Sequence, residues 1–185
     1  MLNIVQWILF LLGSVVLVLV SLRSLQSLSA HGFYRFFAWE ILLVVFVFNM
    51  RTWFQNPFAW YQLISWVLLI ASAVLVIFGV RLLRQIGKQD AGRDDASLYA
   101  FEKTSKLVAV GLYRYIRHPL YSSLFFLGWG MFFKSPSWLD LGWVLLCTFF
   151  LITTAHIEEV ENVKYFGDAY IEYMKYTKMF IPYVF

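Results

Sequence analysis

The sequence predicts an all-α integral membrane protein with about five transmembrane helices in one domain. Of its 185 residues, 61% are apolar, 21% are aromatic and only 14% are charged, whereas about a quarter of the residues in a water-soluble domain are charged. The apolar residues form long runs, and one crossing of a bilayer takes about 20 of them. A chain of this length therefore has room for a small bundle of membrane helices and for no separate soluble domain of ordinary size.

Three membrane helices are expected in the first half of the chain. Residues 2–22 are almost wholly apolar, with no basic residue before them and no small-residue cleavage site after them, so we expect a retained helix rather than a removable signal peptide. Residues 36–53 form a shorter run, in which Glu40 and Arg51 are expected near the helix ends, where charges reach lipid headgroups. Residues 61–83 form the clearest span, between interfacial aromatic residues and two arginines.

Two further apolar runs, residues 120–133 and 139–155, predict a helical hairpin across the Lys-Ser-Pro-Ser turn at 134–137. Residues 85–112, which precede the hairpin, form a connection of mixed charge. Its residues 85–106 are a candidate lid over the cofactor.

The last part of the chain is expected to be helical as well. Polar residues after the hairpin recur at helical spacing, which predicts that its second helix continues into the cytosol as far as Gly167. Asp168 is expected to cap a short last helix at the membrane interface, with Tyr170, Tyr173 and Met174 as its apolar stripe.

The formal charge of +4 predicts membrane topology rather than nucleic-acid binding. With five crossings, every Lys and Arg except Arg51 and Lys134 falls on one side of the membrane, so the positive-inside rule places the N-terminus outside and the C-terminus in the cytoplasm. The single cysteine, Cys147, excludes an intrachain disulfide and any metal site built from several cysteines. We therefore expect neither a nucleic-acid partner nor a metal.

Polar chemistry gathers in two clusters at the cytoplasmic rim. Residues 111–121, at the start of the fourth helix, are cationic and aromatic, and residues 156–161, near the end of the fifth, are anionic. The hairpin brings the clusters together, and Arg117 is the candidate partner for the glutamates, which are unfavourable near a helix C-terminus. The first cluster can also be interpreted as interfacial residues that reach headgroups, and the second as a solvated helix end. His31 has no partner at a recognisable spacing and receives no role.

Two ordered motifs span the second half of the chain. The first reads Gly-x-Tyr-x-x-x-Arg-His-Pro-x-Tyr, and the second is a Glu-Glu pair followed by Phe-Gly-x-x-Tyr-x-x-Tyr and a closing proline. In order and spacing, residues 80–185 thereby resemble the isoprenylcysteine carboxyl methyltransferase family and its wider group of small membrane methyltransferases, which includes phospholipid N-methyltransferases. The residues that carry the resemblance are Gly111, Tyr113, Arg117, His118, Pro119, Tyr121, Glu158, Glu159, Phe166, Gly167, Tyr170, Tyr173 and Pro182.

The resemblance implies one membrane methyltransferase domain over residues 1–185, with N-terminal transmembrane helices in 1–60 and a cofactor-binding and catalytic core in 80–185. It implies that S-adenosylmethionine is the methyl donor. It also implies that the protein lies in the inner membrane of a bacterium or archaeon. By similarity, the methionine and ribose parts would be held by His118, Tyr121, Glu158 and Glu159. The adenine slot would be lined by Val108, Gly111 and Tyr113.

The resemblance also implies a lipophilic acceptor, small or lipid-anchored, that enters from the bilayer. A carboxylate acceptor is ionised at pH 7 and needs a cation to orient it, which would make Arg117 catalytic. An amine acceptor must lose a proton, which would make Glu158 or Glu159 the base. Ser123, Asn162 and Met179 depart from the family pattern and favour a second interpretation, a non-catalytic membrane protein that binds lipid or cofactor. A transporter has little support, because the sequence predicts no charges at the membrane midplane.

Overall fold

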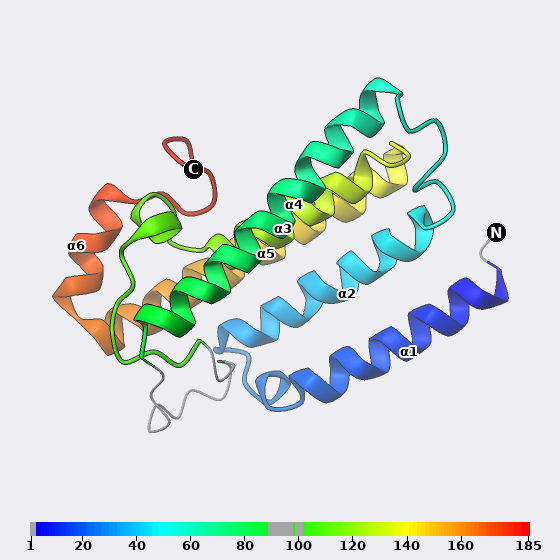
Figure 1. The fold of residues 1–185 in the computed structure, drawn as a ribbon. Helices are drawn as coiled ribbons and strands as arrows, with labels where there is room; N and C mark the ends of the chain where they lie inside the picture. Colours follow the sequence, from blue (N-terminus) through cyan, green and yellow to red (C-terminus); the bar gives the residue numbers. More distant parts are fainter. Residues whose placement is uncertain (1–2, 89–97, 99–101) are drawn as a thin grey trace.

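The computed structural model describes residues 3–88, 98 and 102–185. Every regular element in this part of the chain is helical, which confirms the all-α prediction (Figure 1). The helices are α1 (Ile4–Ser21), α2 (His31–Asn49), α3 (Trp60–Ile86), α4 (Pro119–Phe132), α5 (Trp138–Phe166) and α6 (Asp168–Tyr176), with short 3-10 turns at Ser24–Gln26 and Gly111–Arg114.

Successive helices of the bundle run antiparallel to one another (Figure 1). α1 packs on α2, α2 packs on α5, and α4 lies against both α3 and α5. The buried core consists of side chains from α2, α4 and α5, joined by Met179 and Phe180 of the C-terminal segment. The C-terminal segment is therefore an integral part of the bundle.

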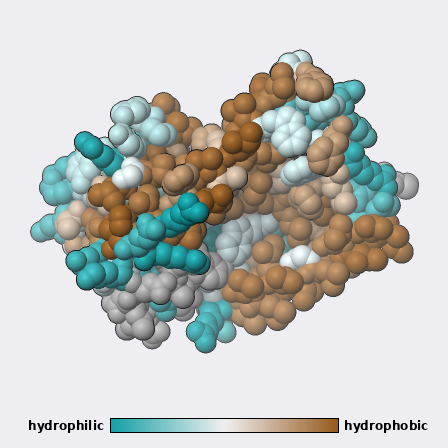
Figure 2. All heavy atoms as spheres, in the orientation of Figure 1, coloured by the Kyte–Doolittle hydropathy of each residue, from teal (hydrophilic) through white to brown (hydrophobic). Residues whose placement is uncertain are grey.

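Four of these helices, α1, α2, α3 and α5, are long and apolar enough to cross a membrane. The expected number of about five is therefore not confirmed, because α4 has only 14 residues. At 1.5 Å per residue it extends about 21 Å, which is short of a hydrocarbon core of about 30 Å. Hydrophobic residues cover α1 and the middle of the bundle, and hydrophilic residues gather toward its ends (Figure 2). The protein is an integral membrane protein.

The bounds of α2 differ from the prediction, because it begins at His31 rather than at residue 36. The polar side chains of its first turns are buried and paired inside the protein, so the helix need not begin at the apolar run. As a result Glu40, expected near a helix end, lies in the middle of α2. There its Oε1 accepts a hydrogen bond from Ser14 of α1 at 3.0 Å.

The turn between α4 and α5 is buried against α3. Gln62 Nε2 donates to the carbonyl oxygens of Thr52 and Lys134 at 3.2 and 2.9 Å, and Lys134 Nζ donates to Gln62 Oε1 at 3.0 Å. The same ammonium lies 3.3 Å from the ring centroid of Trp66, within cation–π range. These contacts anchor the turn between α4 and α5 to α3, at the end of the bundle that lies away from both polar clusters.

Local sequence features fix the start of α4 and both ends of α5. Pro119 occupies the first turn of α4, where its missing N–H costs nothing, and the Ser137 side chain caps α5 by accepting from Asp140 N at 3.1 Å. α5 continues past the predicted membrane region to Gly167, whose φ of 61° favours glycine and ends the helix as expected.

The last helix differs from its prediction in two respects. Gly167 occupies the N-cap position of α6, and Asp168, the expected cap, is its first helical residue. The expected apolar stripe faces the protein: Tyr170 and Tyr173 are only 3% and 2% exposed. α6 is thus packed on the bundle by its aromatic face. The expected lid, residues 85–106, falls largely on residues 89–97 and 99–101, which lie outside the described part of the chain.

Candidate active site

A pocket lies at the end of the bundle where α4 begins, and the connection before α4, the first turn of α4, α5 and α6 all contribute to it. Its polar lining is supplied by Glu102, Thr104, Tyr113, Arg117, His118, Tyr121, Glu158, Asn162, Tyr170 and Tyr173. Its apolar lining is supplied by Leu83, Leu98, Leu107, Val108, Pro119, Leu120 and Phe166. The two clusters predicted from the sequence therefore meet at one pocket.

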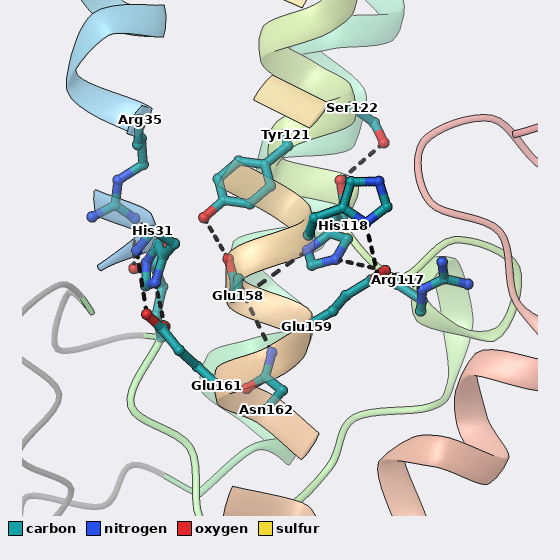
Figure 3. Close-up of polar contacts among 12 residues, drawn as sticks. His31, Arg35, Arg117, His118, Tyr121, Ser122, Glu158, Glu159, Glu161 and Asn162 are labelled. Atoms are coloured by element: carbon teal, nitrogen blue, oxygen red, sulfur yellow. Dashed lines mark hydrogen bonds and ion pairs between the residues drawn. The ribbon is translucent and has the colours of Figure 1, made fainter. Parts of the chain in front are cut away.

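His118 stands between the two glutamates of α5 (Figure 3). Its Nε2 lies 3.4 Å from Glu159 Oε1, and its Nδ1 lies 3.9 Å from Glu158 Oε1. The imidazole stacks on the Tyr121 ring, with centroids 5.4 Å apart and planes at 18°. Because His118 is also the residue before Pro119, which starts α4, the helix start fixes the position of its backbone.

Glu158 is the member of the pair that lines the pocket. It accepts a hydrogen bond from the Tyr121 hydroxyl of α4 and a long one, 3.5 Å, from Asn162 Nδ2 one turn further along α5. Two neutral donors thus hold a carboxylate whose charge faces the pocket, an arrangement that suits a cationic ligand.

Glu159 points toward Arg117 (Figure 3) and is not among the lining residues. Its Oε1 accepts from Arg117 Nε at 2.6 Å, which confirms Arg117 as the predicted partner of the acidic cluster. Arg117 Nη1 also donates to the carbonyl oxygens of Thr177 and Met174 at 2.5 and 3.4 Å. Arg117 therefore joins α5 to the end of α6 while it also lines the pocket.

The C-terminal segment closes this side of the site by backbone pairing. Arg117 N donates to Lys178 O at 2.7 Å, His118 N to Met179 O at 3.2 Å, and Ser122 Oγ to Phe180 O at 2.9 Å. The first two bonds fix the two peptide groups that precede the His118 side chain, so the chain after α6 helps to set the geometry of the catalytic candidates.

Three buried tyrosines complete the wall formed by α6 and the 3-10 turn. Tyr173 Oη donates to the carbonyl oxygen of Tyr113 at 2.6 Å. Burial raises the pKa of Tyr113 well above its usual range, and the negative charge of Glu158 adds to the effect. Burial likewise raises the pKa values of Tyr170 and Tyr173. These phenols are therefore neutral hydrogen-bond donors at physiological pH.

Gly111, expected in the adenine slot, is not among the residues that line the pocket. Its φ is 60°, and a Cβ there would lie 2.8 Å from Leu82 Cδ1 of α3. Glycine is needed here because the chain turns sharply against α3 just before the 3-10 turn that carries Tyr113.

Replacing Gly111 with alanine should destabilise the protein by about 1–2 kcal/mol, because an L-residue is strained at positive φ. Gly142→Ala in α5 is the matched control: a Cβ at Gly142 meets nothing within 4 Å, so stability should rise by about 0.5–1 kcal/mol. Thermal unfolding in detergent measures both changes. Equal unfolding midpoints for the two variants would contradict the role given to Gly111.

The residues proposed from the sequence thus divide into two groups. Val108, Tyr113, Arg117, His118, Tyr121 and Glu158 line the pocket, whereas Gly111 and Glu159 stand behind it. Sequence reasoning missed Glu102 and Asn162 in the lining, and it missed His31, which is fully buried with its Nδ1 2.5 Å from Glu161 Oε2. The one sequence signal for His31 is its spacing from Arg35, one helical turn away and just before an apolar run. No group of three or more His, Cys, Asp or Glu within the described residues could hold a metal ion.

Comparison with known proteins places the site in a family. The family model described as phospholipid methyltransferase matches residues 67–169, which include both clusters. The chain is 29% identical over 125 residues to the protein-S-isoprenylcysteine O-methyltransferase of Xenopus laevis and 28% identical over 125 residues to that of Homo sapiens. These matches cover 65% of this chain and 42% and 43% of the two relatives, so the chain spans less than half of their length. No solved structure matches the chain.

The matched region begins within α3 and ends at the start of α6, so it contains the pocket-lining parts of α4 and α5. Since the match covers more than half of the residues, the chain belongs to the phospholipid methyltransferase family.

Proposed function

We propose that this protein is a membrane-embedded methyltransferase that moves a methyl group from S-adenosylmethionine to a lipophilic acceptor. The observation that carries the proposal is the pocket in which Glu158, Tyr121 and Arg117 converge at one end of a membrane bundle. A donor can reach such a pocket from water and an acceptor from the bilayer. The proposed activity is that of the family to which residues 67–169 belong.

The donor set of the pocket fits S-adenosylmethionine. The cofactor supplies an electrophilic methyl group on a sulfonium, and it also carries an ammonium, a carboxylate and an adenine. We assign the cationic groups of the donor to the carboxylates of Glu158 and Glu102, and its carboxylate to the His118 side of the pocket. The apolar side chains of Leu107 and Val108, with Tyr113, offer a slot for a flat ring.

We propose a carboxylate as the first acceptor class, as the names of the two relatives suggest. A carboxylate is already ionised at pH 7, so no base is required. Arg117 lines the pocket and is permanently charged, so it can orient the carboxylate oxygen toward the methyl carbon. Glu159, which holds Arg117 Nε, is then a positioning residue.

An amine acceptor is the second candidate, and one observation favours it: Glu158, whose side chain is only 20% exposed, presents its carboxylate to the pocket. A phospholipid amine must lose a proton before it attacks the methyl carbon, and Glu158 is placed to accept it. The family's description as phospholipid methyltransferase is consistent with this class.

Incubation of the purified protein with methyl-labelled S-adenosylmethionine, total membrane lipid and prenylcysteine analogues tests the proposal. We expect a labelled lipophilic product, either a base-labile ester for a carboxylate acceptor or a base-stable methylamine for an amine. If folded protein binds the donor and labels nothing, the non-catalytic interpretation replaces the enzyme.

We also propose that the pocket faces the cytoplasm. Arg51 and Lys134 lie toward the opposite end of the bundle, near Thr52 and Gln62, and most other cations lie on the pocket side, as the positive-inside rule requires. A cysteine introduced at Arg51 should react with an impermeant maleimide in intact cells, and one at Lys164 should not. The reverse pattern would overturn the orientation.

A further inference from the structure

The first turns of α2 lie beside the pocket, although they are outside the region matched by the family model. His31 and Arg35 are one helical turn apart and share a face of α2. Both are buried, with 0% and 3% of their surface exposed. A buried guanidinium is costly unless it is paired, so its partner indicates what it does.

His31 fixes α2 to the helix that carries the site glutamates. Its Nδ1 lies 2.5 Å from Glu161 Oε2, and its backbone N donates to Glu161 Oε1 at 3.2 Å. Glu161 follows Glu158 by three residues, so the two side chains leave neighbouring positions on one face of α5, and Glu161 extends to His31 (Figure 3). The start of α2 therefore contacts α5 next to the glutamates of the site.

Arg35, on the same face of α2, contacts a second acidic residue of the pocket lining, Glu102. Its Nη1 donates to both oxygens of Glu102, at 3.1 and 3.3 Å, and its guanidinium carbon lies 5.2 Å from the ring centroid of Trp39. The two paired side chains are only 4% and 13% exposed. Glu102 lines the pocket, whereas Arg35 does not.

We infer that Arg35 is a positioning residue for the methyl-donor site, and that it holds the Glu102 carboxylate where it attracts the cationic donor. This inference rests on the proposed function. Glu102 lies outside any helix, on the connection before α4 and ahead of the 3-10 turn at Gly111–Arg114, so its side chain has no helix to orient it. A cation anchored on a buried helix supplies that orientation, and Glu102 with Glu158 then gives the pocket a carboxylate on each of two walls.

Titration of the full-length protein in detergent with S-adenosylmethionine, and separately with S-adenosylhomocysteine, tests this inference. Arg35→Gln and Glu102→Gln should each weaken binding of the sulfonium donor about tenfold. The thioether product lacks the sulfonium charge, so its affinity should fall less. Arg35→Lys should restore part of the loss because it keeps the charge. Arg51→Gln, which removes the same charge from an exposed position at the other end of the bundle, should change neither affinity.

The double variant Arg35→Gln with Glu102→Gln separates positioning from general destabilisation. If the two residues act as a unit, the double variant should bind the donor no more weakly than either single variant. Additive losses, or equal losses for donor and product with no rescue by lysine, would overturn the inference and leave the proposed function intact. Wild-type protein that is folded and binds neither compound would overturn both.

Discussion

Glu158→Gln should lower kcat/KM for methyl transfer by about 30-fold or more. The substitution keeps the shape of the side chain and an acceptor for the Tyr121 hydroxyl, but it removes the negative charge that faces the donor's cationic groups. Loss of one partner from a buried, hydrogen-bonded charge pair costs about 2–5 kcal/mol, which is about 30-fold at the low end. Initial rates over a range of donor concentrations measure the change.

The pattern of the loss reports the role of Glu158. If it holds the donor, KM for S-adenosylmethionine should rise more than kcat falls. If it is the base for an amine acceptor, kcat should carry the loss. Glu172→Gln is the matched control, since this glutamate of α6 is 65% exposed and pairs with the equally exposed Lys175. Kinetic constants within twofold of wild type for Glu158→Gln would remove Glu158 from the site.

Arg117→Ala should destabilise the protein by about 3–5 kcal/mol as well as impair turnover. The substitution leaves Glu159, whose side chain is 7% exposed, without its closest cation, and it leaves the carbonyl oxygens of Thr177 and Met174 without a donor. Uncompensated buried charge accounts for costs of this size. Thermal unfolding in detergent, followed at several wavelengths, measures the loss.

A comparison of variants separates the structural role of Arg117 from a catalytic one. Arg114→Ala removes the same charge three residues away at an exposed position and should leave the unfolding midpoint unchanged. Arg117→Lys keeps a charge near Glu159 but cannot serve Glu159 and both carbonyl groups with the same planar geometry, so it should recover only part of the stability. An Arg117→Ala protein as stable as wild type would contradict the assignment of Arg117 as the link between α5 and α6.

The sequence was sufficient for the features that rest on local patterns. The apolar runs predicted the helices of the bundle, and Gly167 was expected to end α5, as it does. The pairing of Arg117 with the acidic cluster was predicted from one argument about unlike charges on a helical hairpin, and the structure confirms it for Glu159.

The errors arose where tertiary pairing overrides local composition. The second helix was expected to begin with the apolar run at residue 36, but buried partners on other elements satisfy His31 and Arg35, so α2 begins five residues earlier. The same shift places Glu40 in mid-helix, where Ser14 of α1 meets it. A pattern within one segment cannot show a partner 130 residues away in the sequence, as in His31 with Glu161.

The roles within the Glu-Glu pair could not be distinguished by sequence either. Adjacent residues on a helix point about 100° apart, and which of them faces the pocket depends on how α5 is rotated against α4. The structure directs Glu158 to the pocket and Glu159 to Arg117. The acceptor class depends on this difference, because a pocket-facing base and a pocket-facing cation favour different acceptors.

Isothermal titration of the purified wild-type protein with S-adenosylmethionine tests the central claim most directly. The account predicts saturable binding of one donor per chain, with a dissociation constant in the ordinary range for enzyme substrates, about 1 μM to 1 mM, and competition by S-adenosylhomocysteine. Folded protein that shows no binding at millimolar donor would contradict the assignment of this pocket as a methyl-donor site.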